Sequence, residues 1–137
     1  MTSEASPMRR AISEAKRAAD RGEVPVGAVV TRDNQIIATG QNRRESSQDP
    51  TAHAELIAIR KASDELSSWR LTDCTIYVTL EPCPMCCGTI INSRIPELIY
   101  GASDPKSGCV ESLYKLLDDE RFNHTVNVEQ SALSDEC

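Results

Sequence analysis

Residues 53–55 read His-Ala-Glu, and residues 82–86 read Pro-Cys-Pro-Met-Cys. The imidazole of His53 and the thiols of Cys83 and Cys86 are ligands of the kind that zinc prefers. A structural zinc site is normally closed by four protein ligands, whereas a catalytic site keeps its fourth position for water. Three ligands beside a spare carboxylate, that of Glu55, therefore indicate a catalytic zinc site.

The segments around both motifs predict the elements that carry them. Asp49-Pro50-Thr51 is a helix-start signal, so we expect a helix over Ala52–Leu66 with His53 in its first turn. Thr75–Leu80 reads as a strand, and the proline that follows it precedes a helix from about Cys83 to Ser93. The sequence thus places each ligand at the start of a helix.

Cys83 and Cys86 are three residues apart, which puts both sulfurs on one face of their helix. The positive helix N-terminus and a bound zinc both favour thiolates, so we expect both cysteines to be deprotonated. Zinc can lower the pKa of a bound water from about 15.7 to about 7, which makes a hydroxide nucleophile available. Glu55 is then placed as a proton shuttle for hydrolysis, and the resemblance of His53-Ala54-Glu55 and Pro82-Cys83-x-x-Cys86 to the pattern of zinc nucleobase deaminases implies hydrolytic deamination.

A structural zinc knuckle or ribbon is the competing interpretation of a Cys-x-x-Cys pair with a histidine. Such a site needs a fourth ligand, and Cys87 is the only nearby candidate. Because Cys87 is adjacent to Cys86, it faces another side of the helix, and we interpret it as a small core residue. The noncatalytic interpretation is therefore the weaker one.

The remaining segments predict one α/β domain over residues 1–137, with a five-stranded mixed sheet flanked by helices. Apolar residues at helical spacing, followed by Gly22, indicate a helix over residues 7–21. Asp33-Asn34 suits a hairpin turn between the first two strands. The other expected elements are strands at 24–31, 35–39, 97–101 and 125–129, a polar loop at 41–49 and a short helix at 112–118.

The net charge and the cysteine content indicate which partners and which cellular compartment to expect. The 137 residues carry a net charge of −6, and residues 101–137 hold eight acidic and three basic side chains. This balance argues against nonspecific electrostatic binding of nucleic acid, although scattered arginines could still meet phosphates. These are Arg9, Arg10, Arg43, Arg44 and Arg94. No signal peptide or membrane span is apparent, so we expect a cytoplasmic protein whose six cysteines are reduced.

From about Met8 to Cys137 the chain resembles the bacterial tRNA-specific adenosine deaminases of the cytidine deaminase-like superfamily. The pattern H-x-E…P-C-x-x-C is shared across zinc nucleobase deaminases. More specific are the segments 24–30 (VPVGAVV), 49–55 (DPTAHAE), 77–83 (YVTLEPC), 92–95 (NSRI), 100–108 (YGASDPKSG), 123–124 (NH) and 134–137 (SDEC).

The resemblance implies a three-layer cytidine deaminase-like fold and a homodimer that converts adenosine to inosine at the wobble position of a tRNA anticodon stem-loop. It implies one Zn²⁺ per subunit, bound by His53, Cys83 and Cys86, with Glu55 as proton shuttle. Asn42 would hydrogen-bond the flipped nucleoside, and Val24 and Ala28 would line its pocket. Asp104, Lys106 and Ser107 would meet the anticodon backbone, with Asn123 nearby.

Without the resemblance, simpler roles would be expected for several of these residues. Asn42 would be a turn residue, Asp104 and Lys106 solvated loop charges, His124 a packing or capping residue, and Trp69 a packing anchor. The family usually continues with a basic helix that helps to grip the anticodon stem, whereas this sequence stops at Cys137. It is either a natural short form or a truncated chain, and the difference bears on the affinity for tRNA. The alternative activity is deamination of a free base or nucleoside of the guanine or cytosine type, which fits residues 100–108 less well.

Overall fold

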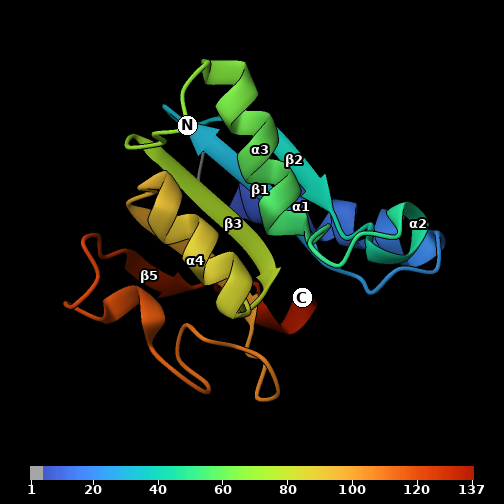
Figure 1. Ribbon diagram of the computed structural model, residues 1–137. Helices are drawn as coiled ribbons and strands as arrows, with labels where there is room; N and C mark the ends of the chain where they lie inside the picture. The colour runs from blue at the N-terminus through green and yellow to red at the C-terminus, as the bar shows by residue number, and fades with distance from the viewer. Residues whose placement is uncertain (1–4) are drawn as a thin grey trace.

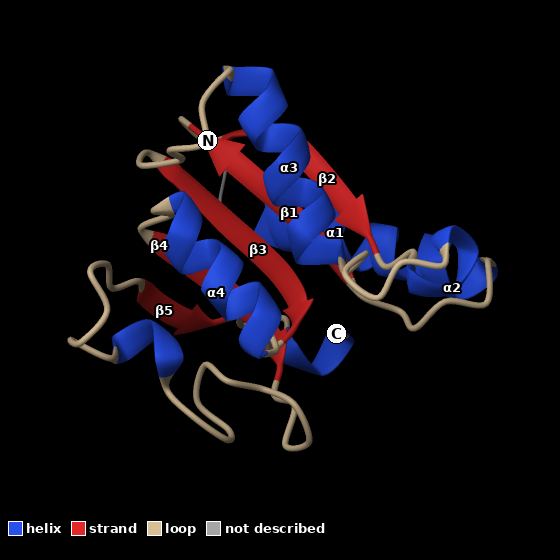
Figure 2. Ribbon diagram, viewed as in Figure 1, coloured by secondary structure: helices blue, strands red, loops and turns tan. Residues whose placement is uncertain are grey.

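The computed structural model describes residues 5–137, which form a five-stranded sheet in the order β2-β1-β3-β4-β5 (Figures 1 and 2). Its strands are β1 (Gly27–Arg32), β2 (Gln35–Gln41), β3 (Cys74–Leu80), β4 (Glu97–Ala102) and β5 (Asn127–Gln130). β1 is antiparallel to both β2 and β3, whereas β3, β4 and β5 run parallel. The predicted mixed sheet of five strands is confirmed.

Helices cover both faces of this sheet and complete three layers. α1 (Ala5–Asp20) packs on β1, β2 and β3 from one side, while α3 (Ala54–Leu66) and α4 (Pro84–Ser93) lie side by side on the other (Figure 1). The core divides in the same way. Val29, Tyr77 and Ile99 pack under α1, and the larger cluster, with Val30, Ile76, Val78 and Leu98, packs under α3 and α4.

Two glycines allow the helices to approach the sheet closely. A Cβ on Gly40 would lie 2.3 Å from the carbonyl oxygen of Ala54 in α3. A Cβ on Gly27 would lie 2.0 Å from the carbonyl oxygen of Ala11 in α1, on the opposite face. Both distances are far below a van der Waals contact, so any larger residue at these two positions would force the helix away from the sheet.

The hairpin between β1 and β2 turns at Asp33 and Asn34, whose φ angles are 52° and 63°. Two consecutive residues with positive φ define a type I′ turn, the form whose twist matches paired strands. Asp and Asn tolerate this conformation better than most residues. The sequence predicted the hairpin but not its turn type.

Several predicted boundaries were wrong. The first strand begins at Gly27 rather than at residue 24, because Val26 donates its amide to the Val24 carbonyl in a tight turn. The polar loop 41–49 contains a short helix, α2 (Arg44–Ser47). Residues 112–118 form only a 3₁₀ turn at Leu116–Asp118, because the Leu116 amide donates to the Cys109 carbonyl and not to the Ser112 carbonyl that it would meet in a helix.

Trp69 is not a packing anchor. Its side chain is exposed, and the guanidinium carbons of Arg70 and Arg94 lie 4.8 and 5.8 Å from its ring centroid. Cation–π contacts therefore stabilise the ring at the surface. By contrast, Cys87 is fully buried in the core as predicted.

A membrane-spanning helix is not found in the described part of the chain: no helix there has the length and apolar character that a bilayer requires.

Candidate active site

The three predicted metal ligands come together at the N-terminal ends of α3 and α4. His53 is the N-cap of α3 and Cys83 the N-cap of α4, both with extended backbone, and Pro84 follows at the first helical position. His53 thus lies one residue ahead of the first turn in which the sequence placed it. Neither side chain makes an N-cap hydrogen bond to its own helix, and both contribute to the same cluster of ligand atoms.

The geometry of the cluster fits a tetrahedral zinc ion. The Nδ1 atom of His53 lies 3.6 Å from the Cys83 sulfur and 3.5 Å from the Cys86 sulfur. With Zn–S near 2.3 Å and Zn–N near 2.0 Å, tetrahedral angles place nitrogen and sulfur about 3.5 Å apart. Among the described residues this is the group of His, Cys, Asp and Glu side chains close enough to hold a metal.

Hydrogen bonds and burial shift the pKa values of the two thiols in opposite directions. A hydrogen bond from Cys86 and another from His53 outweigh burial and lower the pKa of Cys83 to about 4. The resulting thiolate, together with burial, raises the pKa of Cys86. Since zinc takes thiolates, its binding would release the proton of Cys86, which makes metal affinity dependent on pH.

Glu55 lies beside the cluster without belonging to the ligand set. Its side chain is buried in the first turn of α3. Burial, with the Cys83 charge adding to it, raises the pKa of Glu55 to about 7. A carboxyl group whose pKa is close to neutral can both accept and donate a proton, as a shuttle must.

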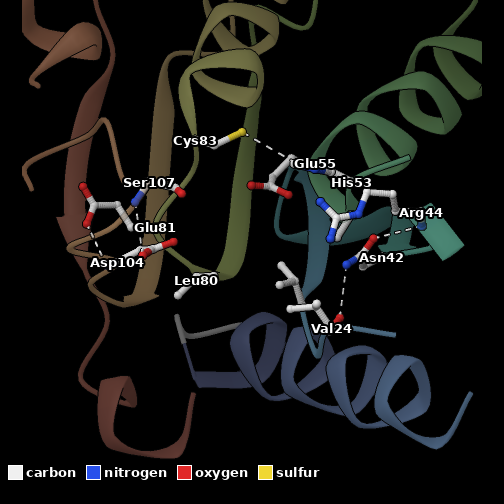
Figure 3. Close-up of a pocket in the computed structure, with 12 residues that line it drawn as sticks. Val24, Asn42, Arg44, His53, Glu55, Leu80, Glu81, Cys83, Asp104 and Ser107 are labelled. Carbon is white, nitrogen blue, oxygen red and sulfur yellow. Dashed lines mark hydrogen bonds between the residues drawn. The ribbon is translucent and has the colours of Figure 1, made fainter. Parts of the chain in front are cut away.

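A cavity of about 220 Å³ opens over the cluster (Figure 3). This is smaller than the roughly 300–1,000 Å³ of most ligand sites, so it suits a single flat ring better than a large ligand. The following residues line it: Val24, Val26, Asn42, Arg44, His53, Ala54, Glu55, Leu80, Glu81, Cys83, Asp104 and Ser107.

Asn42 is buried at one side of the cavity, and its side chain is fixed by the backbone. Its Nδ2 donates to the Val24 carbonyl at 3.3 Å, and its Oδ1 accepts the Arg44 amide at 3.1 Å. Each end of a side-chain amide can make a second hydrogen bond. Asn42 therefore has one donor and one acceptor left for a ligand.

The segment that carries Arg44 is fixed by Glu23. The Glu23 carboxylate is buried and accepts the amides of Glu45 and Ser46 at 3.0 and 2.7 Å. Arg44 itself is exposed at the mouth of the cavity (Figure 3).

Asp104 and Ser107 form the opposite side of the mouth (Figure 3). The Asp104 carboxylate accepts the amides of Lys106 and Ser107 at 3.0 and 3.3 Å, which closes a turn. Lys106 and Asn123 are exposed and do not line the cavity, so their predicted contacts with RNA stay predictions. His124 donates from its Nε2 atom to the Ile95 carbonyl at 2.8 Å, in keeping with a packing or capping role.

One predicted pocket residue is misplaced. Ala28 is fully buried in the core beneath α3, because its position in β1 turns its side chain toward that helix. Val26, which precedes the strand, lines the cavity instead. Sequence reasoning also missed Leu80 and Glu81, although their place directly before Pro82-Cys83 was a usable signal.

Comparison with known proteins identifies the family. The family model for MafB19-like deaminases matches residues 2–135. A tRNA-specific adenosine deaminase of Bacillus subtilis is 48% identical over all of this chain and 85% of its own length.

Two solved structures are also similar. One comes from work on A-to-I editing by tRNA:A34 deaminases at the wobble position of transfer RNA. It superposes with a TM-score of 0.93 at 41% sequence identity, and the match covers 97% of this chain and 96% of the other chain. A guanine deaminase of Bacillus subtilis is 43% identical with a TM-score of 0.72, but covers only 74% of this chain and 66% of its own. The chain therefore belongs to the MafB19-like deaminases, by the family model, and to the family of the tRNA-specific adenosine deaminases, by its relatives.

Proposed function

We propose that this protein hydrolyses adenosine to inosine at the wobble position of a tRNA anticodon, using one zinc ion per subunit. The observation that carries the proposal is the cluster of His53, Cys83 and Cys86, which offers three ligands beside Glu55 at the floor of a cavity of base size. The names of the relatives point to adenosine in tRNA as the substrate.

The chain's own residues would divide the work. His53, Cys83 and Cys86 would hold the zinc, which supplies a water of lowered pKa at its open position. Glu55 takes one proton from the attacking water and passes it to ring nitrogen N1; it then takes the second proton from the hydroxyl added at C6 and gives it to the leaving amino group, so that the C6–N bond breaks as the C6 carbonyl forms. Adenosine and water thereby become inosine and ammonia, with Glu55 returned to its starting state.

Recognition of the base would fall to the residues above the cluster. Asn42 supplies a hydrogen-bond donor and an acceptor from a position that Val24 and Arg44 fix. Val24, Val26 and Leu80 add apolar contact for an extruded base, which loses stacking when it leaves the RNA.

The exposed residues at the mouth would meet the RNA backbone. Arg44 supplies a positive charge on one side, and Asp104 and Ser107 supply polar groups on the other. Lys106 and Asn123 extend this surface, a role that rests on the resemblance to the family.

A homodimer in the cytoplasm is also part of the proposal, supported by the family. Light scattering of the purified protein tests the dimer: a mass of two chains supports it, and a mass of one chain, 15.0 kDa, contradicts it.

Deamination of a free base is the second candidate, because the guanine deaminase of Bacillus subtilis shares 43% identity over part of this chain. The cavity would admit a free purine as well as an extruded one. A substrate comparison separates the two candidates.

The test is inosine formation in a synthetic anticodon stem-loop with adenosine at the wobble position. The same stem-loop with that adenosine moved by one position is the matched control, and free guanine and cytosine are assayed in parallel. Inosine confined to the wobble position supports the proposal. Ammonia from a free base without inosine in the RNA supports the second candidate.

A further inference from the structure

Glu81 is a buried carboxylate to which hydrogen bonds from one loop converge. Its Oε1 accepts the Asp104 amide at 3.0 Å and the Ser112 hydroxyl at 2.5 Å. Its Oε2 accepts the amides of Val110, Glu111 and Ser112 at 3.1, 2.8 and 2.9 Å. Within residues 5–137 none of the ion pairs involves Glu81, so these five donors compensate its charge.

Five donors leave Glu81 little capacity to bind a substrate. An ionised carboxylate offers about four lone-pair sites. Although Glu81 lines the cavity, its acceptor sites are therefore already taken by the loop. Glu55 is placed to exchange protons with the substrate, whereas Glu81 has its acceptor sites occupied by the loop. Glu81 therefore acts by holding the loop in place and not by contacting the reacting atoms.

The loop is folded tightly around this carboxylate. A Cβ on Gly108 would lie 2.3 Å from Cδ of Glu81 and 2.6 Å from the Asp104 carbonyl oxygen. The Gly108 amide in turn donates to that carbonyl at 2.8 Å, and the Cys109 amide donates to the Pro82 carbonyl at 2.9 Å. Residues 103–112 contain no helix or strand, so these contacts take the place of regular secondary structure.

The same loop carries the polar groups on one side of the cavity mouth. Asp104 and Ser107 lie there, facing Arg44 and Asn42 across the cavity (Figure 3). Glu81 precedes Cys83 by two residues. One short segment after β3 thus fixes both a metal ligand and the side of the mouth that an RNA strand would meet.

We propose that Glu81 is a positioning residue for RNA: it holds the loop 103–112 so that Asp104 and Ser107 are placed to bind the nucleotides flanking the target base. This role presupposes that the chain acts on RNA as proposed above. A free base makes no contact beyond the cavity, so Glu81 matters chiefly for a substrate within a polynucleotide.

Kinetics of Glu81→Gln on the anticodon stem-loop test the proposal, with zinc content confirmed for each protein. An amide keeps the size of the carboxylate but turns one acceptor into a donor that faces the loop's own donors. Hydrogen bonds to a charged group are worth enough for roughly a tenfold effect each, so we expect KM to rise about tenfold or more while kcat changes little.

A second variant keeps the test valid if Glu81→Gln does not fold. Gly108→Ala retains the carboxylate but pushes the loop away from it, and it should raise KM in the same way. Asp119→Asn is the matched control, because Asp119 also accepts a backbone amide, that of Arg121, in a turn that does not line the cavity. Its KM should stay at the wild-type value.

Hydrogen exchange of the amides of Asp104, Glu111 and Ser112 provides a readout independent of activity. Faster exchange together with a raised KM supports the proposal. An unchanged KM in folded Glu81→Gln or Gly108→Ala overturns it, as does a fall in kcat at constant KM. A wild-type protein inactive on the stem-loop would refute the proposed function instead, and the exchange data would still report whether Glu81 holds the loop.

Discussion

The close approach of Gly40 to the first turn of α3 offers a way to displace His53 and Glu55 together. A Cβ at residue 40 would lie 2.3 Å from the Ala54 carbonyl oxygen and 2.8 Å from the Ala58 amide nitrogen. An ordinary contact begins at 3.4 Å. Gly40→Ala therefore requires β2 and the start of α3 to separate by about 1 Å, because packed backbone does not compress.

The expected losses of stability and of turnover both follow from that displacement. Overpacking of a core typically costs about 1–3 kcal/mol of unfolding free energy. A misplacement of about 1 Å between catalytic groups and substrate can reduce turnover roughly 10²-fold. We expect Gly40→Ala to fold, with a lower Tm and with kcat on the stem-loop reduced by about that factor.

Gly27→Ala is the matched control. Its added Cβ would lie 2.0 Å from the Ala11 carbonyl oxygen, so it should destabilise the fold by a similar amount. It displaces α1 on the opposite face of the sheet, and none of the described residues that line the cavity belongs to α1. We expect kcat to stay within a few-fold of wild type.

Urea unfolding gives the two stabilities, and initial rates are measured on zinc-saturated protein well below both unfolding temperatures. The reasoning is refuted if Gly27→Ala loses as much kcat as Gly40→Ala at equal loss of stability. It is equally refuted if Gly40→Ala keeps wild-type kcat.

Three further predictions follow from the site and from a buried carboxylate on α1. Cys86→Ala should abolish stoichiometric zinc binding while Cys87→Ala retains it, measured by elemental analysis of the purified proteins; equal zinc content in both would be the contrary result. Removal of the metal by a chelator should abolish activity and lower Tm, because a ligand bound only by the folded state stabilises it, and added zinc should restore both. Burial alone would raise the pKa of Glu14, but hydrogen bonds from Arg10 and Gln41 outweigh it and hold that pKa below 4.5. The ionised Glu14 carboxylate therefore stabilises the fold above pH 4.5, and this contribution is lost as the pH falls through the pKa of Glu14 in the folded state. On acidification the wild-type protein should lose more unfolding free energy than Glu14→Gln, measured by urea unfolding from pH 6 to pH 3.

The elements around the zinc motif were predictable from sequence because their signals are local. Pro84 marks the start of α4, and the β-rich run of residues 75–80 identified β3. The spacing of Cys83 and Cys86 was enough to predict that their sulfurs converge. That His53 joins them depends on the topology, which brings the N-terminal ends of α3 and α4 to one edge of the sheet.

What the sequence did not predict depends on contacts between distant segments. The expected helix at 112–118 does not form because the Leu116 amide donates to the Cys109 carbonyl and not to that of Ser112, while Ser112 itself is bound to Glu81, 31 residues earlier. The pocket assignment of Ala28 was wrong because the side chain's direction depends on the register of β1 against β2 and β3. The exposed ring of Trp69 lies near the guanidinium groups of Arg70 and Arg94, and the contact with Arg94 joins segments that are far apart in sequence.

The central claim is that Glu55 carries the proton in the reaction without holding the metal, and Glu55→Gln tests it most directly. Zinc per chain and inosine formed at the wobble adenosine of the stem-loop are measured on the same preparation. We expect zinc to remain at one per chain while the rate falls by roughly 10²–10⁴-fold, the usual contribution of a general acid–base. Inosine formation at the wild-type rate by the zinc-loaded variant would contradict the claim.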